Sequence, residues 1–347
     1  MSGRTVLTVP ELYGRIEAIL RRAGLNAVQA GGLARVITAA ERDACTSHGI
    51  YRIEGILRTI KAGKVRPDAV PELAPQRASA VLAVDAKGGF VNPAVELGVP
   101  ALVDRARSTG IAALVINDAA HFSALWAEVE AVTEAGMAGL AMCPSYAAVA
   151  PAGGSAALLG TNPFAFGWPR DGREPYVFDF ATSVAARGEI ELRRQAGRPL
   201  PDGWAVDAAG RPTTDPEAAL AGAMLPFGGH KGSALATMIE LVAGIMVGDR
   251  TSVEALDAIG TTTLCPTHGE LIVAFAPQVI AAGRPGNPFD RAETLFDAIV
   301  GQGARLPSQR RFSARARSES EGIGLSEAQV RQLDRFLEHG LDSVAGG

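Results

Sequence analysis

One short segment of the sequence combines a hydroxyl, an imidazole and a guanidinium group. In TSHGIYR, residues 46–52, His48 stands just before a predicted helix and Arg52 follows four residues later, so both side chains can point into one space. Arg52 could hold a carboxylate through two hydrogen bonds while His48 transfers a proton nearby and Ser47 orients the imidazole. The alternative is an ordinary helix start in which Thr46 or Ser47 is the N-cap and His48 lies on the surface. The segment alone leaves both interpretations open.

A second histidine follows a predicted strand. INDAAHFSALW, residues 116–126, is typical of a strand end leading to His121, and α/β sheets bind ligands beyond the carboxyl ends of their strands. A helix beginning at Ser123 would direct its amide groups at a bound anion. A lone histidine is more often structural, so this alternative also stays open.

Basic residues occur in two further predicted loops. In PFGGHKGSALA, residues 226–236, glycines around His230 and Lys231 permit close backbone approach before a long apolar helix, which favours a phosphate cradle. RLPSQRR, residues 305–311, places three arginines around a proline in a predicted loop. A solvated charge run is the usual explanation for such a loop, and binding of an anion such as a 2′-phosphate is the alternative.

Two other segments carry polar side chains between apolar residues. LLGTNPFAFGWP, residues 158–169, presents Thr161 and Asn162 in a rigid turn ahead of a proline, and its apolar flanks predict a buried turn whose polar groups need partners. In VFDFATSVAARGEIE, Asp179 follows a strand and Glu189 lies in the next helix. Such a carboxylate is usually solvated, but one with a buried partner could shift the pKa of a proton donor.

Helices and strands alternate along the chain that must position these residues. This alternation indicates an α/β protein with at least partly parallel pairing. Apolar spacing predicts helices at about 8–23, 27–42, 51–62, 93–109, 124–135, 183–196, 232–247, 291–301 and 326–339. Short apolar and β-branched runs predict strands near 79–85, 111–118, 139–145, 177–183 and 271–277.

Composition excludes several classes of protein. With 347 residues, the chain is long enough for two domains or one large domain with insertions. A net charge of −4 and an aromatic content of 5% argue against nucleic acid as a partner. Three cysteines, odd in number and far apart, argue against a disulfide framework and a zinc site and fit a reducing cytoplasm. No segment resembles a signal peptide or a membrane span, so we expect a cytoplasmic chain with no membrane or metal partner.

Common nucleotide-binding and hydrolase motifs are missing. No G-x-G-x-x-G follows a strand, and Lys231 in GGHKGS is followed by glycine rather than by serine or threonine, so neither a Rossmann nor a Walker site is supported. No H-E-x-x-H or G-x-S-x-G is present either. Three of the five histidines nevertheless fall in the loops described above, which indicates one site built from less common loops.

Taken in order, TSHGIYR, NDAAHFSA, GTNPFAF, FDFATS, GGHKG and RLPSQRR resemble the malate/L-lactate dehydrogenase-2 family of NAD(P)-dependent oxidoreductases over about residues 10–340. The resemblance implies a non-Rossmann NAD(P)-binding fold of the sulfolactate/malate dehydrogenase-like type. In this fold a mixed sheet has helices on both faces and helical segments at both ends of the chain. It also implies a homodimer. The expected division is a helical, dimerisation and substrate-side domain at about 1–120 and 300–347, and an NADP-binding domain at about 121–299.

Within this family, PSYAAVAPAGG before GTNP and ARGEIELRRQAG after DFATS look most like the Δ1-piperideine-2-carboxylate/Δ1-pyrroline-2-carboxylate reductases. HFSALW lacks the glycine that usually follows His-Phe, and Ser123 at that position recurs in this branch. The resemblance implies Ser47 and Glu189 as a relay pair, His48 as proton donor, and Arg52 and Thr161 as substrate contacts. The implied NADPH contacts are His121, Phe122, Ser123, Ala124, Leu125, Asp179, Phe180, Ala181, His230, Lys231, Arg305, Leu306, Pro307, Ser308, Gln309, Arg310 and Arg311.

The implied activity is NADPH-dependent reduction of a cyclic imino acid to L-proline or L-pipecolate. Hydride would reach the imine carbon while His48 supplies a proton and Arg52 binds the carboxylate. A 2-hydroxy acid dehydrogenase, which would reduce a 2-oxo acid, is the alternative, and a non-catalytic binding protein on the same scaffold is a more distant one. Ring size is left open, as is NADH in place of NADPH.

Overall fold

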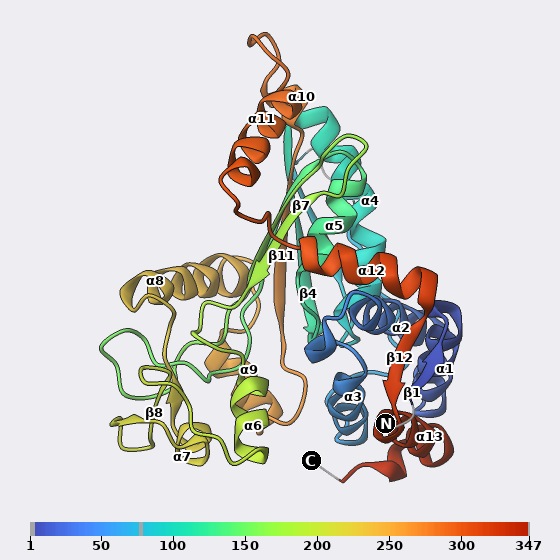
Figure 1. The fold of residues 1–347 in the computed structure, drawn as a ribbon, viewed down its shortest axis with the longest axis vertical. Coiled ribbons are helices and arrows are strands. Elements are labelled where there is room, and N and C mark those ends of the chain that lie inside the picture. Colours follow the sequence, from blue (N-terminus) through green and yellow to red (C-terminus); the bar gives the residue numbers. More distant parts are fainter. Residues whose placement is uncertain (1–3, 76–78, 346–347) are drawn as a thin grey trace.

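The computed structural model describes residues 4–75 and 79–345 (Figure 1). Residues 1–3, 76–78 and 346–347 belong to the ranges 1–120 and 300–347 expected for the substrate-side domain, and they lie outside the described residues.

One seven-stranded sheet forms the centre of the molecule (Figure 1). β3 and β4 pair in parallel, whereas the other described neighbours in this sheet pair antiparallel. The expected mixed sheet is therefore confirmed. Its strands, in spatial order, are β2 (Glu72–Leu73), β3 (Val81–Asp85), β4 (Ile111–Ala120), β11 (Thr267–Phe275), β5 (Ala138–Met142), β6 (Phe164–Trp168) and β7 (Tyr176–Phe180).

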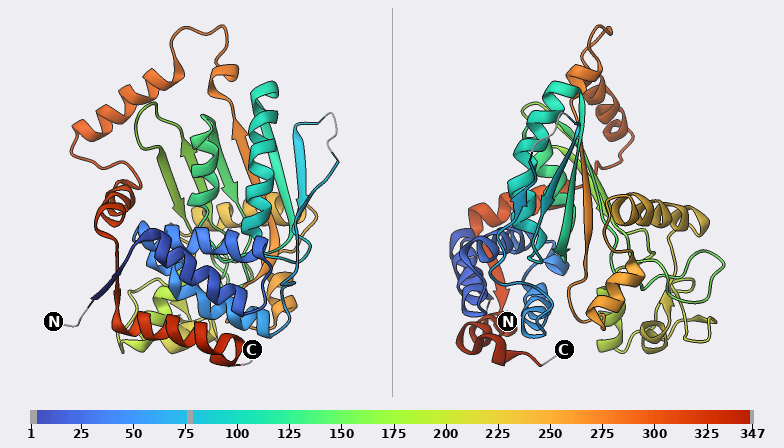
Figure 2. Two further views of the ribbon diagram at one scale, coloured as in Figure 1. Left: turned by 90° about the vertical axis from the view of Figure 1, so that its right-hand side faces the viewer. Right: turned by 180° about the vertical axis from the view of Figure 1, so that it is seen from behind.

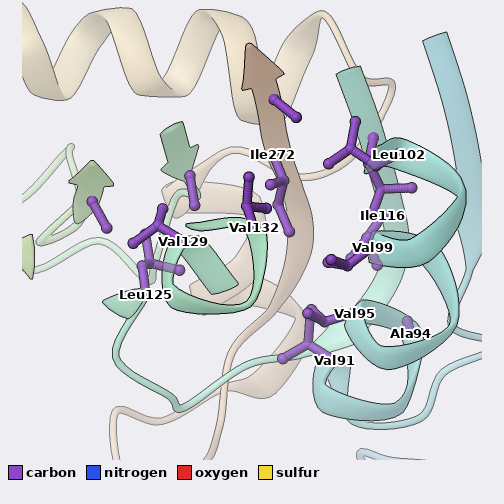
Figure 3. Packing of buried hydrophobic residues seen from close by; sticks show 14 of the residues in the cluster. Val91, Ala94, Val95, Val99, Leu102, Ile116, Leu125, Val129, Val132 and Ile272 are labelled. Atoms are coloured by element: carbon purple, nitrogen blue, oxygen red, sulfur yellow. The ribbon is translucent and has the colours of Figure 1, made fainter. Parts of the chain in front are cut away.

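Helices cover both faces of the sheet, as expected (Figure 2). α4 (Val91–Thr109) and α5 (Trp126–Glu134) pack on one face, and α8 (His230–Ile239) with the π-helical η3 (Glu240–Ile245) packs on the other. On the first face, α4 contributes a row of apolar side chains to the main core (Figure 3). Gly98 allows this close approach, because a Cβ there would lie 2.5 Å from Cδ2 of Leu114. None of the described helices combines the length and apolar character needed to cross a membrane.

The two ends of the chain pack together beside the sheet. α1 (Val9–Arg22), α2 (Ala27–Arg42) and α3 (Ile53–Lys61) share a hydrophobic core with α13 (Glu327–His339), and β1 (Arg4–Leu7) pairs with β12 (Ile323–Ser326). The spacing that predicts the first helix is confirmed, since Leu12, Ile16, Ile19 and Leu20 are all buried. The domain division at residue 120 stays a prediction, and the central sheet combines strands from both sides of that residue.

The Pro- and Gly-rich stretch after residue 196 forms a small lobe of its own. A three-stranded sheet in the order β10 (Ala223–Met224), β8 (Ala205–Val206) and β9 (Pro212–Thr213) packs with α6 (Arg187–Gln195) and α7 (Pro216–Ala221). The remaining helices are α9 (Ser252–Ile259), α10 (Pro277–Ile280), α11 (Pro288–Gly301) and α12 (Gln309–Glu321).

Several element boundaries differ from those predicted. α5 begins at Trp126 rather than Ser123, because the Trp126 amide donates to the carboxylate of Asp179 at 3.2 Å. The predicted helix 232–247 begins at His230, after Gly229 at φ +61°, and becomes π-helical at Glu240. The segment 305–311 is a loop only as far as Ser308, because its last three residues form the first turn of α12. That helix was not predicted.

One strand contains a local irregularity beside the site. The pairing of β4 with β11 shifts register between His268 and Glu270, so that Asn117 and Asp118 together face a single residue of β11. Asp118 takes a left-handed conformation at φ +52°, and its amide donates to Oδ2 of Asp249 at 2.8 Å. This is a β-bulge, in which one extra residue is accommodated in β4. β4 continues beyond it to Ala120, two residues further than predicted.

Candidate active site

A cavity of about 1080 Å³ brings together most of the residues expected at the site. It opens between the segment around residues 46–52, the ends of β4 and β7, and the start of α12. The expected residues that line it are Ser47, His48, Arg52, His121, Phe122, Ser123, Ala124, Thr161, Asp179, Phe180, Ala181, Arg305, Leu306, Pro307, Ser308, Gln309, Arg310 and Arg311.

Four expected residues do not line this cavity. Leu125 is fully buried in the main core between the central sheet and the helices α4 and α5, so its side chain cannot reach a ligand. Glu189 faces Arg193, with 3.5 Å between Oε1 and Nη2, and its side chain is 47% exposed. His230 and Lys231 are exposed at the start of α8, where His230 lines a separate groove. The glycine loop around them therefore lies apart from the main cavity of the same chain.

Ser47, His48 and Arg52 form one contiguous group, as their spacing predicts. The Ser47 hydroxyl lies 3.0 Å from Nδ1 of His48, and Nη2 of Arg52 lies 3.4 Å from Nε2 of the same imidazole. A guanidinium can only donate hydrogen bonds, so Nε2 is the acceptor and Nδ1 carries the proton towards Ser47. Burial, then the Arg52 charge and His121, lowers the pKa of His48 to about 3. His48 is therefore a neutral imidazole in the free site.

Arg52 is fixed with part of its guanidinium free. Its Nε donates to the backbone oxygen of Ser47 at 2.7 Å, and Nη2 contacts His48. Nη1 forms no hydrogen bond with any described residue. This positive group faces a cavity next to a neutral imidazole, an arrangement that suits a small carboxylate.

Thr161 lies in the buried turn that its apolar flanks predict. Asn162 is fully buried at φ +32°, and its amide nitrogen donates to Oε1 of Glu240 at 2.8 Å and to the backbone oxygen of Ala236 at 3.0 Å. The Thr161 carbonyl accepts from the amide of Thr182. These contacts hold the backbone of the cavity wall at Thr161.

Asp179 takes the place that the sequence suggested for a bound anion. Its carboxylate accepts from the first amide of α5, so a side chain of the protein already occupies that helix terminus. Burial raises the pKa of Asp179 to about 6, although the Trp126 amide and Arg311 act against this rise.

The arginines of the segment 305–311 fall into two groups. Arg311 is buried and donates to Oδ2 of Asp43 at 2.9 Å and to Oε1 of Glu130 at 3.0 Å, so its charge is already paired. Arg305 and Arg310 form no ion pair with a described residue. They also line a second, adjoining cavity of about 910 Å³ together with Arg317.

A buried polar cluster behind His121 has no counterpart in the sequence prediction. Nε2 of His121 lies 4.0 Å from Sγ of Cys143 and 3.5 Å from Oε2 of Glu270, and its ring stacks on His268 with 5.4 Å between centroids. Glu128 is the fifth member of the cluster. The one signal in the sequence is Glu270, an acidic residue directly before the apolar run LIVAF. The absence of a metal site stays a prediction.

Comparison with known proteins agrees with the family that the motifs resemble. A family model described as malate/L-lactate dehydrogenase matches residues 7–334. The chain is 70% identical over 345 residues to a protein of Agrobacterium fabrum named Delta(1)-pyrroline-2-carboxylate reductase, covering 99% of this chain and 100% of that relative. It is 53% identical over 332 residues to a Delta(1)-pyrroline-2-carboxylate/Delta(1)-piperideine-2-carboxylate reductase of Pseudomonas aeruginosa, covering 96% and 99%.

Solved structures share the same architecture. A delta1-piperideine-2-carboxylate reductase from Pseudomonas syringae superposes with a TM-score of 0.91 at 39% identity, covering 96% of this chain and 99% of that one. A sulfolactate dehydrogenase from Methanocaldococcus jannaschii superposes with a TM-score of 0.81 at 24% identity, covering 98% and 99%. The second likeness confirms the expected fold type.

Proposed function

The chain belongs to the malate/L-lactate dehydrogenase family, and from this premise we propose that it is an NADPH-dependent reductase of cyclic imino acids. Its substrates would be Δ1-pyrroline-2-carboxylate and Δ1-piperideine-2-carboxylate, and its products L-proline and L-pipecolate. The names of the relatives at 70% and 53% identity support this activity. The observation that carries it is the contiguous group of Ser47, His48 and Arg52 on the cavity wall.

Substrate binding would begin at Arg52. The free Nη1 of its guanidinium can pair with the substrate carboxylate, and Nη2 can join it by leaving Nε2 of His48. Thr161 lines the same cavity and would contact the bound ring.

The cavities fit a dinucleotide. About 1080 Å³ and an adjoining 910 Å³ meet at the segment 305–311, and the unpaired cations Arg305 and Arg310 suit a phosphate. When bound, the nicotinamide supplies hydride to the imine carbon. We propose NADPH rather than NADH because of these two arginines, with the wall residues His121 to Ala124 and Asp179 to Ala181 holding the cofactor.

His48 would supply a proton to the ring nitrogen of the substrate. Pairing of Arg52 with a carboxylate weakens the repulsion that lowers the pKa of His48 and frees Nε2 to carry a proton. A well-placed acid of this kind contributes about 10²- to 10⁴-fold to the rate. Ser47 would hold the ring by accepting the hydrogen bond of Nδ1–H, so that Nε2 carries the proton that is transferred. For Glu189 to join Ser47 in the relay that the family resemblance implies, its carboxylate must leave Arg193.

We also propose a cytoplasmic homodimer. The three cysteines are all free thiols, which suits a reducing compartment. Exposed apolar side chains on α8 and the residues that follow it support a subunit interface: Met238, Leu241, Ile245 and Met246 are 38–66% exposed. This face lies outside the ranges 1–120 and 300–347 for which dimerisation was expected.

One assay series tests the activity. NADPH and NADH would each be offered with the five- and six-membered cyclic imino acids, pyruvate and oxaloacetate. We expect turnover with the imino acids and a preference for NADPH. Turnover with the 2-oxo acids alone would instead establish a 2-hydroxy acid dehydrogenase, and no oxidation with any substrate would favour a binding protein.

A further inference from the structure

Glu270 is a buried carboxyl group without a hydrogen-bond partner. It lies on β11, is 0% exposed, and neither of its side-chain oxygens bonds to a described residue. The polar atom placed against it is Nε2 of His121, 3.5 Å from Oε2. Burying a carboxyl group without a hydrogen-bond partner costs free energy, and the imidazole of His121 is the group placed to offset this cost.

Charged and titratable groups surround this pair from several elements. α5 contributes Glu128, β7 contributes Asp179, and the chain after β5 contributes Cys143. Besides burial, the Arg52 charge lowers the pKa of His121 from the cavity side, and His121 in turn lowers that of His48. His268 stacks on the His121 ring. His268 itself bonds through Nδ1 to the backbone oxygen of Gly269 at 2.9 Å, so it does not compete for Glu270.

The other nitrogen of His121, Nδ1, is not among the fully enclosed side-chain atoms that lack a hydrogen bond, so it reaches open space. The residue lines the main cavity, its Nε2 faces Glu270 and Cys143, and its Nδ1 forms no hydrogen bond with any described residue. Whichever nitrogen carries the imidazole proton therefore decides whether the cavity meets a hydrogen-bond donor or an acceptor at this point.

We propose that Glu270 is a positioning residue that donates a hydrogen bond to Nε2 of His121, so that Nδ1–H is presented to the cavity as a neutral donor. The ligand atom that fits is an oxygen acceptor, either the carboxamide oxygen of the nicotinamide or a carboxylate oxygen of the substrate. This inference rests on the proposed function only for the identity of these two ligands.

The protonation states of the pair agree with this geometry. Burial raises the pKa of Glu270 to about 8, while burial and then Arg52 lower the pKa of His121 to about 4. Between these values Glu270 is a carboxylic acid and His121 a neutral imidazole. Above about pH 8, Glu270 loses its proton to solvent and becomes an acceptor for Nε2–H, which leaves a lone pair at Nδ1 and removes the donor from the cavity.

The test is the pH dependence of NADPH binding, measured by fluorescence titration without substrate. In the unmodified protein the Kd should rise about five- to tenfold between pH 7 and pH 9.5, the equivalent of one hydrogen bond. Glu270→Gln does not titrate and should lose this alkaline step. The matched control, Glu128→Gln, changes a neighbouring buried carboxyl and should keep the step. Because no turnover is needed, failure here is distinct from failure of the proposed reductase activity.

A second arm identifies the ligand, using inhibition by pyrrole-2-carboxylate, a planar analogue of the cyclic imino acid. A step in its Ki, with none in the NADPH Kd, would assign the contact to the substrate carboxylate. Absence of a step from both ligands in the unmodified protein, or its persistence in Glu270→Gln, would overturn the proposal. So would a stoichiometric divalent cation in the purified protein, since a cation would occupy Nε2 in place of the carboxyl proton.

Discussion

Replacement of Asp43 by asparagine tests whether buried ion pairs hold α12 in place. The Asp43 side chain is 0% exposed and accepts from Arg42 at 2.7 Å, from Arg311 at 2.9 Å and from Arg315 at 2.6 Å. Arg311 and Arg315 belong to α12, and they connect that helix to the end of α2. The substitution keeps the shape of the side chain but removes its charge.

The expected loss can be worked out from these contacts. Removing one partner of a buried ion pair costs about 3–5 kcal/mol. Glu130 still pairs with Arg311 at 3.0 Å and with Arg315 at 2.8 Å after the change, and asparagine retains one acceptor oxygen. We therefore expect Asp43→Asn to lower the free energy of unfolding by about 2–3 kcal/mol, which is at or just below the lower limit of that range.

The assay is urea unfolding followed by tryptophan fluorescence, since Arg311 lies over the ring of Trp126 at 4.3 Å. Asp104→Asn is the matched control, because its pair with Arg107 is exposed and should change stability by less than about 0.5 kcal/mol.

The pH dependence gives a second check. Burial opposes ionisation of Asp43, but hydrogen bonds from Arg315 and Arg42 outweigh it and lower the pKa below its usual 3.8. The stabilisation is thus present above the unfolded pKa and disappears as the pH falls through the folded one. A loss below 1 kcal/mol at pH 7, or an equal loss at pH 7 and pH 3, would refute the reasoning.

Three further substitutions test the proposed roles. His48→Ala should remove most of the turnover while NADPH still binds, and near-normal turnover would exclude His48 as proton donor. Arg52→Lys should raise the KM for the imino acid by roughly ten- to a hundredfold, because an ammonium group cannot replace a guanidinium that donates two parallel hydrogen bonds. An unchanged KM would mean that the carboxylate binds elsewhere. Arg310→Ala should raise the Kd for NADPH by roughly tenfold and that for NADH much less, and equal effects would exclude a 2′-phosphate contact.

Features that depend on local sequence were predicted well. The first helix follows from its apolar spacing and from Thr8, which forms a capping box with Glu11. The group of Ser47, His48 and Arg52 lies within six residues, so a single turn of chain brings it together.

Features that depend on distant partners were missed. α12 was not predicted because its buried side includes the charged residue Arg311, and such a pattern does not show a helical stripe of apolar residues. Its burial is compensated by Asp43 and Glu130, which are 268 and 181 residues away in sequence. Likewise, only the pairing of β4 with β11 brings Glu270 next to His121.

The β-bulge at Asp118 has a consequence for the way this site tolerates changes in chain length. At alternate positions of β4, the side chains of Ala112, Leu114 and Ile116 face the core. The extra residue of the bulge shifts this alternation by one position, so that the next side chain facing the core is that of Ala119. His121, two residues further on, follows the same side. A chain that lost one residue here would retain every functional group in its order yet turn this histidine to the opposite face. Insertion or deletion at this point therefore has an effect like that of substituting the histidine itself, whereas surface loops elsewhere can change length without moving the site.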